Sequence, residues 1–310
     1  MKVTWGLENA SFVEMTITTI GSYDGVHRGH LEILTRLFEL KKQFGLDRSI
    51  VLTFDPHPQE ILRRNNTNVD LLTTIEERLA LLASCGVDEV LVIKFSLDFA
   101  KTEYSTFFRR VLIETLGTKA MVVGFNHAFG KNREGDITHL ETLASESSIS
   151  VDAVPPLVVD GISVSSTKIR IALIQGDLKT ANQYLGRPFE LNGIVETGDR
   201  LGQTLGFPTA NLRVAENKLI PADGVYSGFA WLAGDRHRAA ISIGTRQTVT
   251  NSTQRKVEVH ILDFNSNIYE EELKIKLLEY LRPQRKFDSL DSLKRQMAND
   301  ILIVRSVTND

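Results

Sequence analysis

Two histidines, His27 and His30, close the glycine-rich segment Gly-Ser-Tyr-Asp-Gly-Val-His-Arg-Gly-His. An imidazole N–H can donate a hydrogen bond to a triphosphate oxygen while negative charge grows at the α-phosphorus. Gly21 and Gly29 allow the main chain to approach a nucleotide closely, and Asp24 lies between them. The pattern therefore predicts nucleotidyl transfer, although a histidine pair at a helix start is also common as simple capping.

A second anion site is predicted where Ser165, Ser166, Thr167, Lys168 and Arg170 open a helical stretch. Hydroxyl groups before a helix are ordinary N-caps. The same hydroxyls, together with two cations, can also cradle the β- and γ-phosphates where pyrophosphate leaves. One helix start can serve both purposes.

Two further segments follow predicted strands, where parallel sheets place their ligand loops. His57 stands between two prolines just after the strand predicted at residues 49–54, and Asn126 and Asn132 lie in the polar loop that follows the strand at 119–125. An imidazole on stiff backbone and two amides can contact a ligand. The alternative is a pair of solvated loops.

The second half of the chain has its own glycine-rich run, in which Gly193, Gly202 and Gly206 precede Pro-Thr-Ala-Asn. Glycine N–H groups can wrap a nucleotide, and the Thr209 hydroxyl and Asn211 amide oxygen are hard donors suited to Mg²⁺ shared with phosphate. A plain hairpin loop would explain the spacing equally well.

Glu258 lies in the alternating run at 257–263, on the strand face opposite Val257 and Val259. Facing a nucleotide cleft, its carboxylate would suit the deprotonation of an alcohol that attacks a γ-phosphate. It is otherwise a solvated edge charge, and Asp263 at the strand end is a weaker candidate for the base.

Alternating strands and helices in the first half predict an α/β domain with a doubly wound parallel sheet at residues 1–186. Beyond residue 187 the helical period disappears and short alternating runs predict a small antiparallel β-barrel or sandwich, closed by a C-terminal helix at 290–301. The strands expected there are at 189–195, 224–233, 238–243 and 256–263, and the helices expected earlier are at 31–44, 75–85, 102–116, 169–175 and 178–185.

Composition limits the classes of function. With 310 residues, 42% hydrophobic content and a net charge of -3, the chain has the balance of a globular protein without a broad basic face for nucleic acid. We expect no nucleic-acid or membrane partner, because no apolar run reaches spanning length. Cys85 is the single cysteine, expected to be a structural thiol, and a cytoplasmic location follows. The oligomeric state stays open.

Taken together, the motifs resemble those of prokaryotic bifunctional riboflavin kinase/FAD synthetases (FMN adenylyltransferases), whose first half belongs to the His-x-Gly-His superfamily. The resemblance covers nearly the whole chain: Gly-x-Tyr-Asp-Gly-x-His-x-Gly-His, Thr-Phe-Asp-Pro-His-Pro, Ser-Ser-Thr-x-Ile-Arg, Gly-Phe-Pro-Thr-Ala-Asn and Glu-Val-His. It implies that the second domain phosphorylates riboflavin with ATP to give FMN. The first domain would then adenylylate FMN to give FAD and pyrophosphate.

The resemblance also implies residue roles. Glu258 is the kinase base, and Thr209 and Asn211 hold Mg²⁺. The residues implied for adenylyl transfer are His27, His30, Thr167 and Arg170. The implied ATP contacts are Gly21, Asp24, Gly29, Ser165, Ser166, Lys168, Gly193, Gly202 and Gly206. The implied flavin contacts are His57, Asn126, Asn132 and Arg282.

Two positions depart from that family's pattern. Asn126 stands where the family has a carboxylate, and Gln247 stands where it has proline. An amide attracts a cation less strongly than a carboxylate does, so we expect activity with altered efficiency in the first domain. The rival interpretations are a flavin-binding regulatory protein with one or both centres decayed, and a different adenylyltransferase of the same superfamily.

Overall fold

The structure is a computed structural model that describes residues 1–62, 69–125, 130–131, 135–197, 206–245 and 255–306. The chain forms two compact units, Met1–Ser166 and Thr167–Asp310. Within the described residues, no helix combines the length and the apolar character needed to cross a bilayer.

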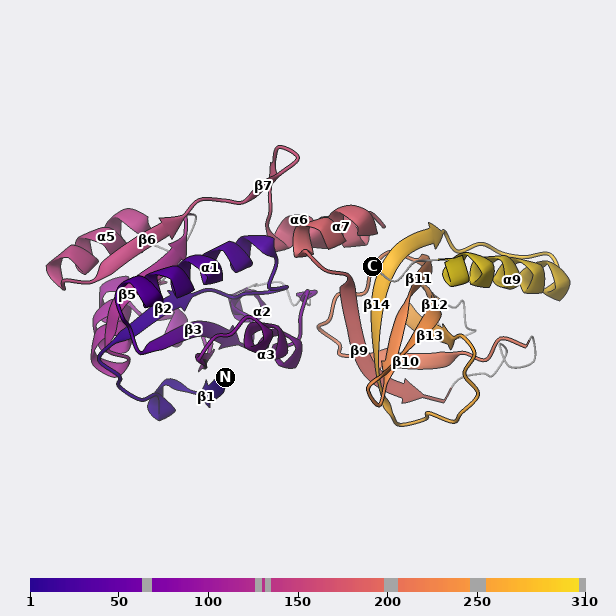
Figure 1. Ribbon diagram of the computed structural model, residues 1–310, viewed down its shortest axis with the longest axis horizontal. Coiled ribbons are helices and arrows are strands. Elements are labelled where there is room, and N and C mark those ends of the chain that lie inside the picture. Colours follow the sequence, from indigo (N-terminus) through magenta and orange to yellow (C-terminus); the bar gives the residue numbers. More distant parts are fainter. Residues whose placement is uncertain (63–68, 126–129, 132–134, 198–205, 246–254, 307–310) are drawn as a thin grey trace. The chain divides into compact units, whose positions relative to one another are not determined.

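The first unit is built on a six-stranded sheet in which every neighbouring pair is parallel, as predicted (Figure 1). Its strands are β1 (Lys2–Trp5), β2 (Thr16–Ile20), β3 (Arg48–Asp55), β4 (Glu89–Lys94), β5 (Thr118–Gly124) and β6 (Ser150–Val154). Their spatial order is β1-β4-β3-β2-β5-β6. The order reverses between β2 and β5, and ligands bind beyond the carboxyl ends of strands at such a switch point.

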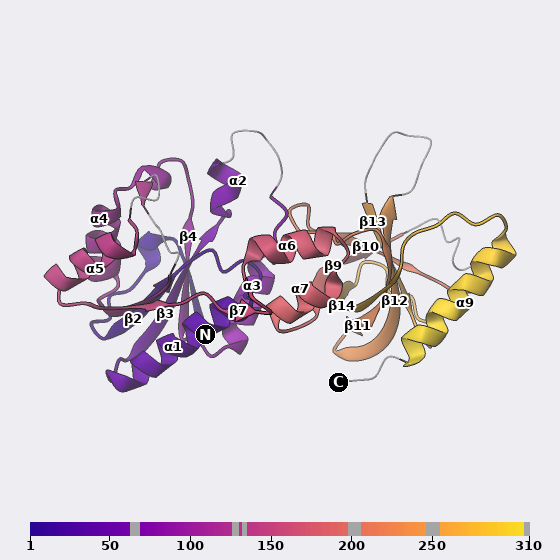
Figure 2. The same cartoon turned by 90° about the horizontal axis from the view of Figure 1, so that it is seen from above.

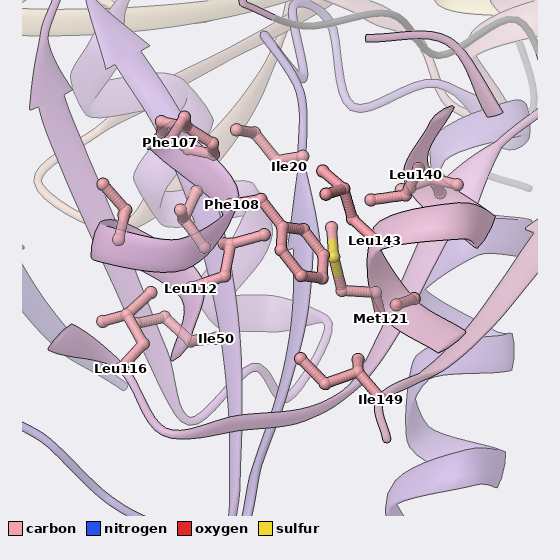
Figure 3. Close-up of a cluster of buried hydrophobic side chains, with 14 of the residues drawn as sticks. Ile20, Ile50, Phe107, Phe108, Leu112, Leu116, Met121, Leu140, Leu143 and Ile149 are labelled. Carbon is pink, nitrogen blue, oxygen red and sulfur yellow. The ribbon is translucent and has the colours of Figure 1, made fainter. Parts of the chain in front are cut away.

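Helices cover both faces of this sheet because the strands are apolar on both sides. The helical segments are η1 (Leu7–Asn9), α1 (Arg28–Gln43), α2 (Pro58–Leu62), α3 (Ile75–Ser84), η2 (Phe99–Lys101), α4 (Tyr104–Phe107), the π-helical η3 (Phe108–Thr115) and α5 (Ile137–Glu146). One core lies under α1 and α3 and contains Leu34 and Leu82. The other, shown in Figure 3, packs Phe108 and Leu140 on the opposite face. The single helix predicted at 102–116 is divided into α4 and η3, a register change that the apolar spacing does not encode.

The second unit contains a closed antiparallel barrel of six strands in the order β10-β13-β12-β11-β14-β9. The strands are β9 (Phe189–Glu196), β10 (Ala210–Val214), β11 (Gly224–Leu232), β12 (Asp235–Thr245), β13 (Arg255–Ile261) and β14 (Glu272–Arg282). Close strand contact requires glycine at Gly228, where a Cβ would lie 2.1 Å from the Lys276 carbonyl oxygen. The closed strand order shows that the second unit is a barrel and not a sandwich.

Helix α9 (Leu290–Ser306) packs on the outside of the barrel against β12 and β11 (Figures 1 and 2). Helices α6 (Ser166–Ile174) and α7 (Leu178–Leu185) group with the barrel, and α7 contacts β14 and β9. A small hairpin, β7 (Val158–Val159) and β8 (Ile162–Ser163), precedes them. The domain limit at residue 187 remains a prediction, because compactness does not decide where a domain can be separated.

Candidate functional sites

The glycine-rich loop leads from β2 to the N-terminus of α1 and brings the two histidines together. The His27 and His30 rings are stacked with their centroids 3.7 Å apart, on one side of the helix start as predicted. His27 Nδ1 accepts a hydrogen bond from the His30 main-chain N–H at 3.3 Å, and His30 Nδ1 accepts one from the His27 main-chain N–H at 3.4 Å. Because both Nδ1 atoms accept, each neutral ring carries its proton on Nε2. That N–H is the donor a phosphate oxygen requires.

Gly29 keeps this pair in place. A Cβ on Gly29 would lie 3.3 Å from the His27 ring, close enough that the imidazole would have to move by a few tenths of an ångström. The main-chain N–H groups at the start of α1 and the positive end of its dipole add to the attraction for an anion. The stacked rings and the helix end together form a preorganised donor set.

Asp24 is fully buried, and its described hydrogen bonds are to the chain itself. Its carboxylate accepts from the main-chain N–H groups of Leu72 at 3.1 Å and Thr73 at 2.9 Å. The Ser166 hydroxyl donates to the Asp24 carbonyl oxygen at 2.9 Å, so the Ser-Ser-Thr segment starts beside the first motif. Asp24 thus positions the loop, and its direct contact with ATP remains a prediction.

A buried guanidinium, that of Arg78, binds the end of β3. Arg78 donates to the Thr53 hydroxyl at 3.3 Å and to the Phe54 carbonyl oxygen at 3.1 Å, and Thr53 donates to the Ser22 carbonyl oxygen at 3.1 Å. Burial lowers the pKa of Arg78 against the attraction of nearby carboxylates, Asp24 first among them. His57 beyond this strand is buried, with Nδ1 accepting from the Gln59 N–H. Its contact with flavin remains a prediction.

Other first-half candidates lie on α6 or outside the described residues. Thr167 is exposed, and Lys168 and Arg170 are partly buried on α6. They belong to the second compact unit, so their approach to the histidines remains a prediction. Four residues named from the sequence lie outside the described residues: Asn126, Asn132, Gly202, and Gln247, which stands where the family pattern has proline.

One outer face of the barrel carries the polar candidates of the second half. Asn211 on β10 is directly opposite Glu258 on β13, and Glu258 is opposite Ser242 on β12. Directly opposed residues project to the same side of a sheet. His260, two residues along β13, shares this face and is opposite Ala240, while Val257 and Val259 point into the barrel core.

Two cavities have Thr209 in their lining, and the first of them opens on this face. The first, of about 290 Å³, lies between the face and α9 and is lined by Thr209, Glu258, Arg282, Phe287 and Met297 among others. The second, of about 560 Å³, is lined by Gly206, Thr209, Asn267 and Tyr269 among others. Thr209 lines both cavities.

Arg282 is placed by a buried ion pair that the sequence did not reveal. Its guanidinium contacts the Asp300 carboxylate of α9 at 2.7 Å, and Gln296 donates to the same carboxylate at 2.8 Å. Arg282 also lies over the Phe287 ring, 5.9 Å from its centroid. This cluster fixes the wall that α9 contributes to the first cavity.

His260 is a second residue that the sequence did not single out. Its Nδ1 lies 2.7 Å from the Pro208 carbonyl oxygen, and the ring meets Phe207 edge to face. It ties β13 to the residue before Thr209. Two signals placed it beside Glu258: the alternation of the 257–263 run and the Glu-Val-His motif of the family resemblance.

The polar face fits a magnesium ion better than a soft metal. Thr209 and Asn211 offer a hydroxyl and an amide oxygen, and Glu258 stands opposite Asn211. The described residues contain no cluster of three or more His, Cys, Asp or Glu side chains that could form a complete metal cage. Mg²⁺ usually takes few protein ligands and shares its remaining positions with water and substrate phosphates.

The glycines of the second half differ in setting. Gly206 has a left-handed φ of 88° and lines the larger cavity. Gly193 lies inside β9, where a Cβ would be 2.2 Å from the Arg213 carbonyl oxygen. Close strand packing therefore explains Gly193, and its contact with ATP remains a prediction.

Comparisons with known proteins match both halves. A family model described as FAD synthetase matches residues 10–168, and one described as riboflavin kinase matches residues 185–308. A bifunctional riboflavin kinase/FMN adenylyltransferase from Listeria monocytogenes is 37% identical over 92% of this chain and 90% of its own length. The protein of that description from Escherichia coli K12 is 36% identical over 98% and 97%. A solved structure from Streptococcus pneumoniae, described as a macrolide-efflux protein, superposes with a TM-score of 0.91 at 29% identity, covering 99% of this chain and 100% of that one.

Proposed function

This chain belongs to the family of bifunctional riboflavin kinase/FMN adenylyltransferases, and we propose that the two polar constellations described above divide its two reactions between them. Riboflavin and ATP give FMN in the riboflavin kinase domain. FMN and a second ATP give FAD and pyrophosphate in the FAD synthetase domain. The predicted pair of activities is confirmed, and the residue roles below are our proposal.

In the kinase reaction the nucleophile is a neutral ribityl hydroxyl, so a base is useful. Glu258 serves as that base and takes the proton as the oxygen attacks the γ-phosphorus. Thr209 and Asn211 would hold Mg²⁺, which when bound neutralises charge on the ATP phosphates. The observation that carries this assignment is the direct opposition of Asn211 and Glu258, together with the presence of both Thr209 and Glu258 in the lining of the first cavity.

In the adenylylation reaction the nucleophile is the phosphate of FMN. It is largely ionised near neutral pH because its second pKa is about 6. No base is required, and His27 and His30 donate from Nε2 to oxygens around the α-phosphorus instead. The stacked ring pair at the N-terminus of α1 supports this role. Thr167, Lys168 and Arg170 are proposed to receive the departing pyrophosphate.

Paired variants of the full chain test the division. Glu258→Gln is expected to reduce riboflavin phosphorylation at least about 100-fold, within the range for loss of a positioned base, while FMN is still converted to FAD. His30→Ala is expected to do the reverse. In each variant, the reaction that is retained shows that the chain is folded. FMN and FAD are measured by chromatography, with riboflavin or FMN supplied in separate assays. Loss of both reactions in either folded variant, each assayed with its own flavin substrate, would overturn the division.

The substrates are small molecules, as the family shows. We further propose that the enzyme works in the cytoplasm without a nucleic-acid partner; the net charge of -3 and the single cysteine support this.

A further inference from the structure

The loop before the histidines has an unusual backbone. Tyr23, Gly25 and Val26 have positive φ values of 50°, 84° and 36°. Only glycine adopts such values without a penalty, and Val26 is β-branched, which makes its conformation the more costly. Conformations of this kind persist where the surrounding structure holds them. The residue after Val26 is His27, so whatever holds this loop also places the first imidazole.

Thr73 contacts the loop at its strained centre. Its hydroxyl accepts a hydrogen bond from the Gly25 N–H at 2.9 Å and donates to Asp24 at 3.2 Å. Its own main-chain N–H donates to the same Asp24 carboxylate oxygen at 2.9 Å. Thr73 is 3% exposed and lies 48 residues further along the chain than Gly25. A single buried hydroxyl thus joins the Gly25 main-chain N–H to the carboxylate of the preceding residue, Asp24.

The setting of Thr73 separates it from an ordinary helix cap. The N-cap of α3 is the next residue, Thr74, which forms a capping box with Glu77. The Thr73 hydroxyl is therefore not used to begin the helix. It is directed at the loop instead, whose Tyr23 ring contacts the His30 ring with centroids 4.8 Å apart.

We propose that Thr73 is a positioning residue for adenylyl transfer, locking Gly25 and Val26 so that His27 stacks on His30 at the start of α1. The proposal rests on the proposed role of the two histidines. Without the hydroxyl, the Gly25 N–H and the Asp24 carboxylate lose the partner they share, so the loop can move His27 relative to His30. Donors aimed at charge that develops in the transition state then lose alignment, which lowers kcat more than it raises KM.

The test uses the full chain with Thr73→Val and Thr73→Ser. Valine keeps the branched shape and removes the hydroxyl, whereas serine keeps the hydroxyl. For FMN adenylylation, Thr73→Val is expected to lower kcat about tenfold or more, equivalent to about 1.4 kcal/mol, with KM for ATP within about twofold. Thr73→Ser is expected to restore most of kcat. Riboflavin phosphorylation, measured in the same preparations, is expected to stay unchanged.

Three results would overturn the proposal: an unchanged kcat in Thr73→Val, a Thr73→Ser variant as slow as Thr73→Val, or a loss that appears wholly as KM. A merely structural threonine would lower the amount of folded protein but not kcat per folded molecule, which urea unfolding and circular dichroism monitor. If Thr73→Val does not fold, Thr73→Cys replaces it, since a thiol is a weak donor and acceptor. His30→Ala separates the two hypotheses: full activity there refutes the histidine roles, whereas normal Thr73→Val kinetics beside an inactive His30→Ala refute Thr73 alone.

Discussion

Replacing Asp300 by alanine tests whether α9 must be fixed to the barrel for riboflavin to bind. Asp300 accepts three contacts from Arg282 at the end of β14, at 2.7, 3.0 and 3.1 Å, and one from Gln296 at 2.8 Å. Helix α9 contributes Leu293, Met297 and Ile301 to the wall of the smaller cavity. Loss of the carboxylate should therefore loosen that wall.

The magnitude follows from burial. The Asp300 side chain is 5% exposed and that of Arg282 is 16% exposed. Removing one partner of a buried ion pair costs roughly 3 to 5 kcal/mol because the other charge remains unpaired. The lower end applies here because Arg282 keeps a bond to the Pro283 carbonyl oxygen at 3.2 Å and reaches solvent. We expect a loss of about 3 kcal/mol in the unfolding free energy of the kinase domain.

Urea unfolding and steady-state kinetics measure this effect. Asp300→Ala is expected to raise the KM for riboflavin at least about tenfold and to leave FMN adenylylation unchanged. Asp263→Ala is the matched control, because Asp263 pairs with Arg305 of the same helix but both side chains are half exposed or more. Exposed pairs contribute little to stability. Equal behaviour of the two variants, or an unchanged KM in Asp300→Ala, would refute the reasoning.

Two other perturbations follow from the first unit. Gly29→Ala places a methyl group 3.3 Å from the His27 ring. It is expected to lower kcat for FAD formation about tenfold or more and to leave riboflavin phosphorylation unchanged. Equal loss in both assays would contradict a local effect on His27. Burial raises the pKa of Glu89, but hydrogen bonds from Thr4 and Lys2 and the Arg48 charge bring it below its ordinary value of 4.5. The stabilisation by the ionised Glu89 carboxylate is therefore present above pH 4.5 and is lost as the pH falls through its lower pKa in the folded protein. Between about pH 7 and pH 3, the unfolding free energy of Glu89→Gln should drop less than that of the unaltered protein. Parallel curves for the two proteins would count against it.

The sequence predicted the parts whose signals are local. The alternation of strands and helices predicted the parallel sheet, and the glycine-rich turn predicted the histidine pair at a helix start. The strand β14 was missed because residues 272–282 are rich in Leu, Lys and Glu, which favour helix. Pairing on both sides, with β11 and β9, closes the barrel and overrides that preference.

The residues that hold the sites were harder to predict than the residues that perform chemistry. Thr73 appears in the sequence as part of a helix-start pattern, and only the fold shows that Thr74 takes the cap while Thr73 turns to Gly25. Asp300 carries no local signal, since its partner Arg282 is 18 residues away on a strand that was not predicted. Such partners are defined by tertiary distance alone.

The smaller cavity, which we propose as the kinase site, is bounded by a barrel face and by a helix. Its barrel side offers polar groups, including Thr209, Ser242 and Glu258, whereas α9 offers Leu293 and Met297. Riboflavin has the same division, a flat ring joined to a chain of hydroxyl groups. We expect the ring to lie against α9, because burial of apolar surface favours that wall, and the ribityl chain to follow the polar face. In that orientation the terminal hydroxyl would lie toward Glu258, the base that we propose, so we expect changes in the packing of α9 to affect riboflavin phosphorylation.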